Sequence, residues 1–236
     1  MSILAILIHN IKISHNSSII RIRRVFVKQI KASFSLGMVS AVVYMTHVFL
    51  GQLLWHEYNP ITTDISSLTA DGAPHSNFLR VLTTIYGICF LVFVVSLLLH
   101  SIKHYHIITS VGYGIMSAMA LSTTIGYSLF PLTADKAEMN FQNTMHILVT
   151  VVVVFTTIAS LFTLALGYWK KEKQKNLGLF CLIFGILIFI FGATNPIGIA
   201  LNLNILGLTE RLVIFILQAF IFIWSFLYTF KIKIVS

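Results

Sequence analysis

Residues 78–101 read FLRVLTTIYGICFLVFVVSLLLHS, a run in which Arg80 is the only residue that carries a full charge. The hydrocarbon core of a bilayer is about 30 Å thick, so a helix needs about 20 mostly apolar residues to cross it. The run has this length. Its apolar residues do not alternate with polar ones, as they would in a strand of a membrane barrel. The stretch therefore predicts one membrane-spanning α-helix.

Five further runs have the same character, at roughly 33–55, 108–130, 143–168, 177–194 and 210–230. The chain of 236 residues is 57% hydrophobic and 10% charged, whereas a soluble domain is about 45–50% apolar and about 25% charged. We therefore predict an all-α polytopic membrane protein whose residues 33–230 form one six-helix bundle. A basic segment, 1–32, precedes the bundle, and a basic tail, 231–236, follows it. The alternative is five spans with the short 177–194 run re-entrant.

The basic N-terminal segment carries six Lys and Arg residues between Lys12 and Lys31, set among isoleucines and valines. Such a composition suits a segment that lies on an anionic cytoplasmic leaflet. It also suits a frayed tail kept inside by its charge. The sequence leaves both interpretations open.

The cations also predict the orientation of the bundle. The net charge is +9, which in a soluble protein would point to nucleic acid. Here the cations cluster instead in the termini and in two loops, so we expect no nucleic-acid partner. With the N-terminus inside, only three of the sixteen Lys and Arg residues fall outside, namely Arg80, Lys136 and Arg211. Because short basic loops stay cytoplasmic, this distribution predicts that both termini lie on the cytoplasmic side of a plasma membrane.

Most of the acidic residues fall on the opposite, outer side, and Glu172 is the only one of seven that falls inside. Helix 210–230 carries a polar stripe of Arg211, Gln218 and Ser225 at seven-residue spacing, which should face protein or water rather than lipid. Helix 143–168 carries a similar stripe that includes His146. These observations predict a polar site at the outer mouth of the bundle. Its candidate residues are Arg211, His146, Arg80, Asp71, Asp135, Asp64, His75 and Ser67.

The tetrapeptide LTAD occurs twice, at 68–71 and 132–135, and both copies fall on the predicted outer side. One closes the long loop before the second span, and the other follows the third span. Antiparallel neighbours bring such ends together, so we expect the copies to meet. We predict that their acids, Asp71 and Asp135, pair with Arg80 and Arg211.

The stretches DISSLTADGAPHSNFLR (64–80), SLFPLTAD (128–135), MHILVT (145–150) and GLTERLVIF (207–215) occur in this order. In sequence and placement they resemble an uncharacterised family of bacterial and archaeal six-helix membrane proteins, domain of unknown function 998. The resemblance implies a six-helix fold over roughly 33–230 and no particular reaction. It also implies a set of family positions, which here are Ser67, Leu68, Gly72, Pro74, Phe130, Pro131, His146 and Arg211.

Three functions remain compatible with these patterns. The first is binding or transport of a lipid headgroup or a small anionic or amphipathic ligand, with membrane lipids as partners, because cations at a membrane interface suit phosphate or carboxylate. The second is a metal-dependent intramembrane hydrolase that uses outer His and Asp side chains. The third is a purely structural network, in which residues such as His47 and His146 only join helices by hydrogen bonds. The sequence does not identify a cofactor.

Overall fold

The computed structural model describes residues 3–136 and 138–231, and within the first helix it places side chains from Gln29 onward. Every regular element in this part of the chain is helical. The long helices are α1 (Ile3–Leu54), α2 (Ser76–His104), α3 (Ile107–Leu121), α5 (Phe141–Leu166), α6 (Lys175–Ala200) and α7 (Leu206–Phe226). The short elements are η1 (Ile65–Thr69), η2 (Ser122–Gly126), α4 (Tyr127–Leu129), η3 (Gly167–Lys171) and η4 (Leu227–Lys231).

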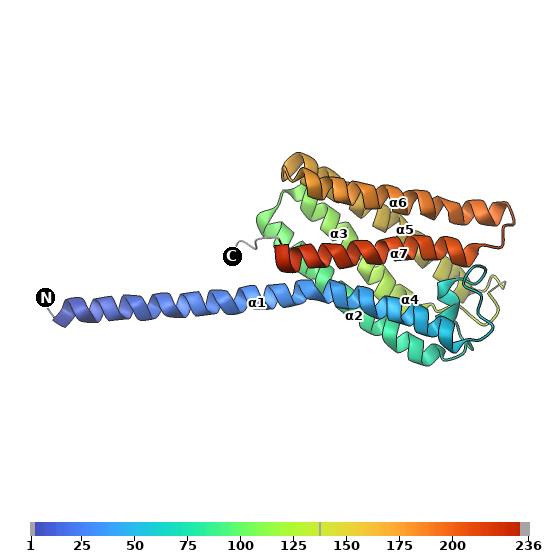
Figure 1. Ribbon diagram of the computed structural model, residues 1–236, viewed down its shortest axis with the longest axis horizontal. Coiled ribbons are helices and arrows are strands. Elements are labelled where there is room, and N and C mark those ends of the chain that lie inside the picture. The colour runs from blue at the N-terminus through green and yellow to red at the C-terminus, as the bar shows by residue number, and fades with distance from the viewer. Residues whose placement is uncertain (1–2, 137, 232–236) are drawn as a thin grey trace.

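Six helical segments are long and apolar enough to cross a membrane, which confirms the prediction of six spans. They are Gln29–Leu54, Ser76–His104, Ile107–Leu129, Phe141–Lys171, Lys175–Ala200 and Leu206–Lys231. They pack into one bundle, with both ends of the chain at the same end of it (Figure 1). The fifth segment, α6, spans 26 residues and is therefore not re-entrant by length. It continues through Pro196, whose ring removes one backbone hydrogen bond from the last turns of the helix.

The basic N-terminal segment continues the first span. Helix α1 runs without interruption from Ile3 to Leu54, and its first half extends beyond the bundle in line with the second half (Figure 1). In the structure residues 3–32 thus belong to the same helix as the first span.

Close approach between helices depends on small residues, as expected where lipid supplies no hydrophobic drive between helices. A Cβ atom on Gly112 of α3 would lie 2.8 Å from the Leu164 side chain of α5, and one on Gly178 would lie 2.8 Å from the backbone nitrogen of Trp169. Gly178, Gly185 and Gly192 of α6 lie seven residues apart, but a Cβ on Gly192 would meet nothing within 4 Å, so this glycine is not needed for a close approach.

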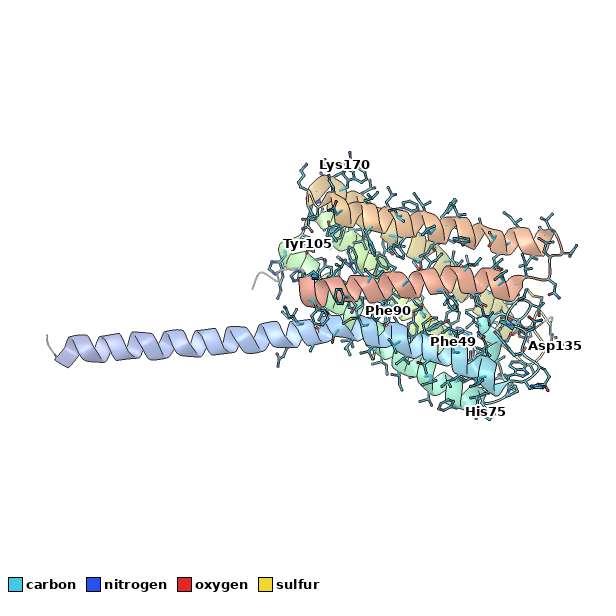
Figure 2. All side chains as sticks on the ribbon, viewed as in Figure 1. Phe49, His75, Phe90, Tyr105, Asp135 and Lys170 are labelled. Atoms are coloured by element: carbon cyan, nitrogen blue, oxygen red, sulfur yellow. The ribbon has the colours of Figure 1, made fainter. Side chains whose placement is uncertain are left out.

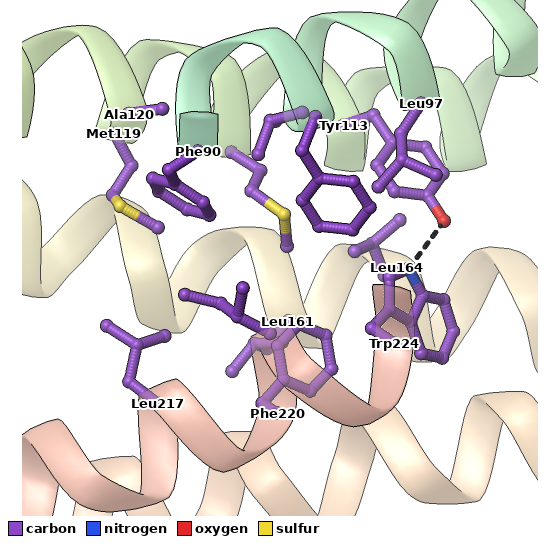
Figure 3. Packing of buried hydrophobic residues seen from close by; sticks show 14 of the residues in the cluster. Phe90, Leu97, Tyr113, Met119, Ala120, Leu161, Leu164, Leu217, Phe220 and Trp224 are labelled. Carbon is purple, nitrogen blue, oxygen red and sulfur yellow. Dashed lines mark hydrogen bonds between the residues drawn. The ribbon is translucent and has the colours of Figure 1, made fainter. Parts of the chain in front are cut away.

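The apolar core lies between α2, α3, α5 and α7, where Phe90, Leu161 and Phe220 are buried (Figure 3). Next to it the Trp224 indole donates to the Tyr113 hydroxyl at 3.0 Å. Tyr113, Tyr168 and Tyr228 share hydroxyl hydrogen bonds in the same region. This part of the bundle is tightly packed, and its tyrosine hydroxyls hydrogen-bond to one another. The space that a ligand could enter lies toward the other end, which we call the long-loop end and which carries the loops 55–75, 130–140 and 201–205.

Candidate functional site

The two LTAD stretches meet at the long-loop end, as the sequence predicts. The backbone nitrogen of Asp71, in the first copy, donates to the carbonyl oxygen of Leu132, in the second, at 2.8 Å. Gly72 follows with a positive φ of 78° and faces Ala134, a backbone conformation that glycine adopts without strain. The first long loop is thus fastened to the segment after α4.

Arg80 pairs with Asp71, which confirms one of the two predicted ion pairs. Its Nη2 lies 2.6 Å from the Asp71 carboxylate. Its Nε and Nη2 also donate to the carbonyl oxygen of Thr69 at 2.9 and 2.8 Å. Because Thr69 is the last residue of η1, Arg80 holds the C-terminal end of this short helix.

Glu210 holds the other end of η1. Its carboxylate accepts from the backbone nitrogen of Ile65 at 2.5 Å and from the Ser66 hydroxyl at 3.3 Å. A carboxylate at the start of a helix and a cation at its end both complement the helix dipole. No pattern in the sequence indicates this role, because the main partner of Glu210 is a backbone nitrogen 145 residues earlier in the chain.

Arg211 is 7% exposed, and its hydrogen bonds go to neutral oxygens rather than to Asp135. Its Nη1 donates to the carbonyls of Pro60, Thr63 and Gly207 at 2.7, 3.1 and 2.9 Å. Its Nη2 donates to the Tyr58 hydroxyl at 2.6 Å, and the guanidinium lies 5.3 Å from the centre of the Tyr58 ring. The predicted pairing with Asp135 is therefore wrong: the first loop turns its own carbonyls toward Arg211.

Tyr58 is itself part of this anchor. Its hydroxyl donates toward the carbonyls of Thr63 and Asp64, at 3.0 and 2.8 Å. Burial raises the pKa of Tyr58 to about 12, although the hydrogen bond from Arg211 acts in the opposite direction. The phenol is thus neutral at physiological pH and serves as a fixed hydrogen-bonding group in the loop.

The remaining acids of the predicted site also organise the loops. Asp64 is buried and forms an ion pair with Lys136. Ser67 donates to the same carboxylate and accepts from Lys136. The Asn143 amide donates to the backbone carbonyl of Asp135 at 2.9 Å. These contacts join the two long loops to each other and to the start of α5.

A cavity of about 320 Å³ lies directly beneath η1, inside the bundle. Its walls come from α1, α2, η2, α4, α5 and α7. Two of the eight predicted site residues line it, Arg80 and His146. Its other polar or aromatic wall residues are Glu210, His47, Gln218, Tyr44, Tyr86, Tyr127, Ser66, Thr69, Thr83, Thr84, Thr123, Thr124 and Ser128.

His146 is oriented by its surroundings. Its Nδ1 lies 2.8 Å from the carbonyl oxygen of Phe130, and its ring lies 4.9 Å from that of Tyr127. Since a carbonyl can only accept, Nδ1 carries the proton and Nε2 of the neutral ring is an acceptor. The prediction that His146 faces the bundle interior near the long loops agrees with this position.

Two buried polar side chains of the cavity wall lack partners among the described residues. His47 is 2% exposed and Gln218 3% exposed, yet both ring nitrogens of His47 and Oε1 of Gln218 have no hydrogen bond. The Gln218 amide group reaches only the Tyr86 hydroxyl, at 3.5 Å. An unsatisfied buried polar group costs about 1–3 kcal/mol and calls for an explanation. Both side chains are therefore available to a molecule in the cavity.

A local irregularity of the backbone shapes another wall. The third span is not one regular helix: α3 passes into η2, a π-helical turn over Ser122–Gly126, before α4. The turn presents Thr123 and Thr124 to the cavity. π-helical turns inside α-helices are rare and frequently lie at functional sites. No sequence signal revealed it, because the residues involved also fit an ordinary helix.

The geometry gives the metal-site alternative no support. Within residues 3–136 and 138–231, no three His, Cys, Asp or Glu side chains come together in a way that would hold an ion. His75, one of the proposed ligands, is exposed at the start of α2 and lies at the edge of the bundle (Figure 2). Asp64 and Asp71 are already held by cations.

The arrangement is that of a multi-pass helical membrane protein with a polar cavity beneath a loop that ion pairs and hydrogen bonds hold in place. Comparison with known families is more specific. Residues 38–227 match the family model described as protein of unknown function (DUF998), and the chain belongs to that family. The match covers the bundle and leaves out the N-terminal part of α1. No curated protein and no solved structure matches the chain.

Proposed function

We propose that this protein binds the polar head of a small amphipathic molecule, such as a membrane lipid, in the cavity beneath η1. The observation that carries the proposal is the presence of His47 and Gln218, buried in the cavity wall with three unpartnered polar atoms. A fourth such atom, Oγ of Ser110, belongs to α3 near its start, at the other end of the bundle. The unsatisfied groups are thus concentrated where a ligand has room.

The charges of the cavity favour a particular head chemistry. Arg211 is engaged with the first loop and does not line the cavity, so the cation in the described wall is Arg80, which is shared with Asp71. Glu210 brings a carboxylate to the same wall. An acid and a cation held at the two ends of η1 suit a zwitterionic or hydroxylated head better than a purely anionic one, since an anion would be repelled by Glu210.

The position of the loops relative to the membrane completes the proposal. With the long-loop end outside, three of the sixteen Lys and Arg residues are outside, as the positive-inside rule favours. Both termini are then cytoplasmic, and in a plasma membrane the cavity opens at the level of the outer leaflet. The ligand would come from that leaflet or from the medium.

Native mass spectrometry of the purified protein tests the proposal with two matched variants. Gln218→Leu keeps the size of the side chain and removes its amide. Thr157→Val makes the same kind of exchange at a buried residue that bonds within its own helix and does not line the cavity. The protein is delipidated and then offered a total lipid extract. We expect a bound lipid on the wild type and on Thr157→Val, and about tenfold less on Gln218→Leu, as one lost hydrogen bond predicts.

Absence of a bound lipid on the wild type, or equal binding by Gln218→Leu, would contradict the proposal. The structural alternative has its own support in the loop network of Arg211 and Asp64. It predicts that Gln218→Leu leaves lipid binding unchanged and raises stability, because the variant removes an unsatisfied buried group.

A further inference from the structure

A second hollow lies on the outer surface of the bundle, in the seam between α1 and α7. It is a groove of about 550 Å³. Met45 and Phe49 line it from α1, and Phe215, Ala219 and Phe222 line it from α7. All of these residues belong to membrane-spanning segments. Phe49 is 57% exposed and lies in the half of the bundle nearer the long loops (Figure 2).

The seam is closed on either side of the groove. On one side Ser225 of α7 donates to the carbonyl of Phe34 at 2.6 Å and accepts from the backbone nitrogen of Met38 at 2.9 Å. On the other side Gln52 of α1 faces Arg211 of α7. With the amide oxygen turned toward the guanidinium, it accepts from Nη2 at 3.2 Å and from Nε at 3.3 Å. The groove occupies the stretch between these two fastenings.

Gln218 lines both the groove and the polar cavity. Each of the other lining residues faces only one of the two spaces. On α1, Tyr44 and His47 face the cavity while Met45 and Thr46 face the groove. The wall between the two spaces is therefore thin at Gln218, where the unpartnered Oε1 lies. The apolar groove and the polar cavity share one wall residue, so together they suit the apolar and the polar part of one amphipathic molecule.

We propose that the α1–α7 groove holds an acyl chain of the lipid whose head occupies the cavity, and that the lipid enters from the bilayer through this seam beside Gln218. This inference rests on the proposed function and assigns the source of the ligand to the membrane rather than to the water phase. It also makes Gln218 the residue that separates the chain site from the head site.

The walls of the groove favour a chain over the helix of a second copy. Helices that associate in lipid usually meet through small residues, which let their backbones approach. Here the small residues are Ala41, Thr46 and Ala219, and they lie between the bulkier Met45, Phe49, Phe215 and Phe222. A polymethylene chain is thin enough to lie along such a floor between aromatic walls, whereas a helix would rest on the rims.

Photo-cross-linking tests the inference. Wild-type protein is placed in nanodiscs of phosphatidylethanolamine and phosphatidylglycerol that include the same lipids with a diazirine midway along one acyl chain. Ala219→Phe fills the groove at an exposed residue, and Ala159→Phe adds the same bulk to an exposed residue of α5 away from both hollows. We expect adducts to concentrate on residues 41–50 and 215–222, and to fall about tenfold or more in Ala219→Phe alone, as overpacking costs predict.

The outcomes separate this inference from the proposed function. If Gln218→Leu abolishes lipid binding but adducts spread evenly over the bundle and Ala219→Phe still binds lipid, the groove assignment is wrong and the cavity remains. If Ala219→Phe changes the oligomeric state and no adduct forms in the groove, the seam is an interface between copies and the inference is overturned. If the wild type binds no lipid at all, both proposals fail.

Discussion

Replacing Arg211 by lysine should detach the first long loop from the bundle, although the charge is kept. The guanidinium donates to Pro60, Thr63 and Gly207 through Nη1 and to Tyr58 through Nη2. A lysine ammonium has one nitrogen and cannot donate to the partners of both Nη1 and Nη2 of the planar guanidinium. If two of the four hydrogen bonds are lost, at about 1.5–3 kcal/mol for each bond to a charged group, the variant loses about 3–6 kcal/mol. Cooperativity within the network makes the sum non-additive, and we expect about 3 kcal/mol.

The measurement is the free energy of unfolding in mixed micelles, together with hydrogen exchange of residues 56–75. Arg80→Lys is the matched control, because both backbone hydrogen bonds of Arg80 go to one oxygen, that of Thr69, which a lysine ammonium can also reach. Its ion pair is more exposed, with side-chain exposures of 34% and 53%, and such pairs contribute about 0–1 kcal/mol. We expect Arg211→Lys to lose exchange protection in the loop and Arg80→Lys to keep most of it. Equal costs for the two variants, or an unchanged loop in Arg211→Lys, would refute the view that Arg211 is the anchor.

Three further results are expected. Gly207→Ala should cost about 1–3 kcal/mol or more, because its Cβ would lie 2.2 Å from the carbonyl oxygen of Thr63. Gly114→Ala, whose Cβ would meet nothing within 4 Å, should be neutral or stabilising by up to about 1 kcal/mol in the same unfolding assay. The pH-dependent absorbance difference between wild type and Tyr58→Phe should show a step near pH 12 rather than near pH 10, because the pKa of Tyr58 is raised to about 12; the stability linked to this proton is full below pH 10 and declines as pH rises toward 12. Ser225→Ala, which removes two hydrogen bonds to α1, should lower the unfolding free energy by about 0.6–2 kcal/mol.

The sequence predicts well those features that depend on the type of side chain at regularly spaced positions. Six spans follow from apolar runs of sufficient length. The pairing of Arg80 with Asp71 follows from the location of both residues on the outer side, where the first LTAD stretch precedes the second span. The inward face of His146 follows from a polar stripe on an otherwise apolar helix. Each of these features depends on residue types at known distances along the chain.

The features that were missed depend on the backbone. Two of the partners of Arg211 are carbonyls of the first loop. Every residue has a backbone carbonyl, so no residue type indicates such a partner. The same holds for Glu210, which caps the backbone nitrogen of Ile65, and for the π-helical turn at η2. His47 and Gln218 were recognised as polar residues on helix faces, but only packing could show that their polar atoms lack partners.

The contrast between the two polar regions of the long-loop end bears on function. In the loops, Arg80, Lys136 and Arg211 all have partners. A network that served structure alone would be expected to be complete in this way, because a half-satisfied buried network is less stable than an apolar one. In the cavity just below, His47 and Gln218 are only 2% and 3% exposed and are left unsatisfied. The loops therefore account for the stability of this end of the bundle, and the cavity retains unused hydrogen-bonding capacity that a bound molecule would complete.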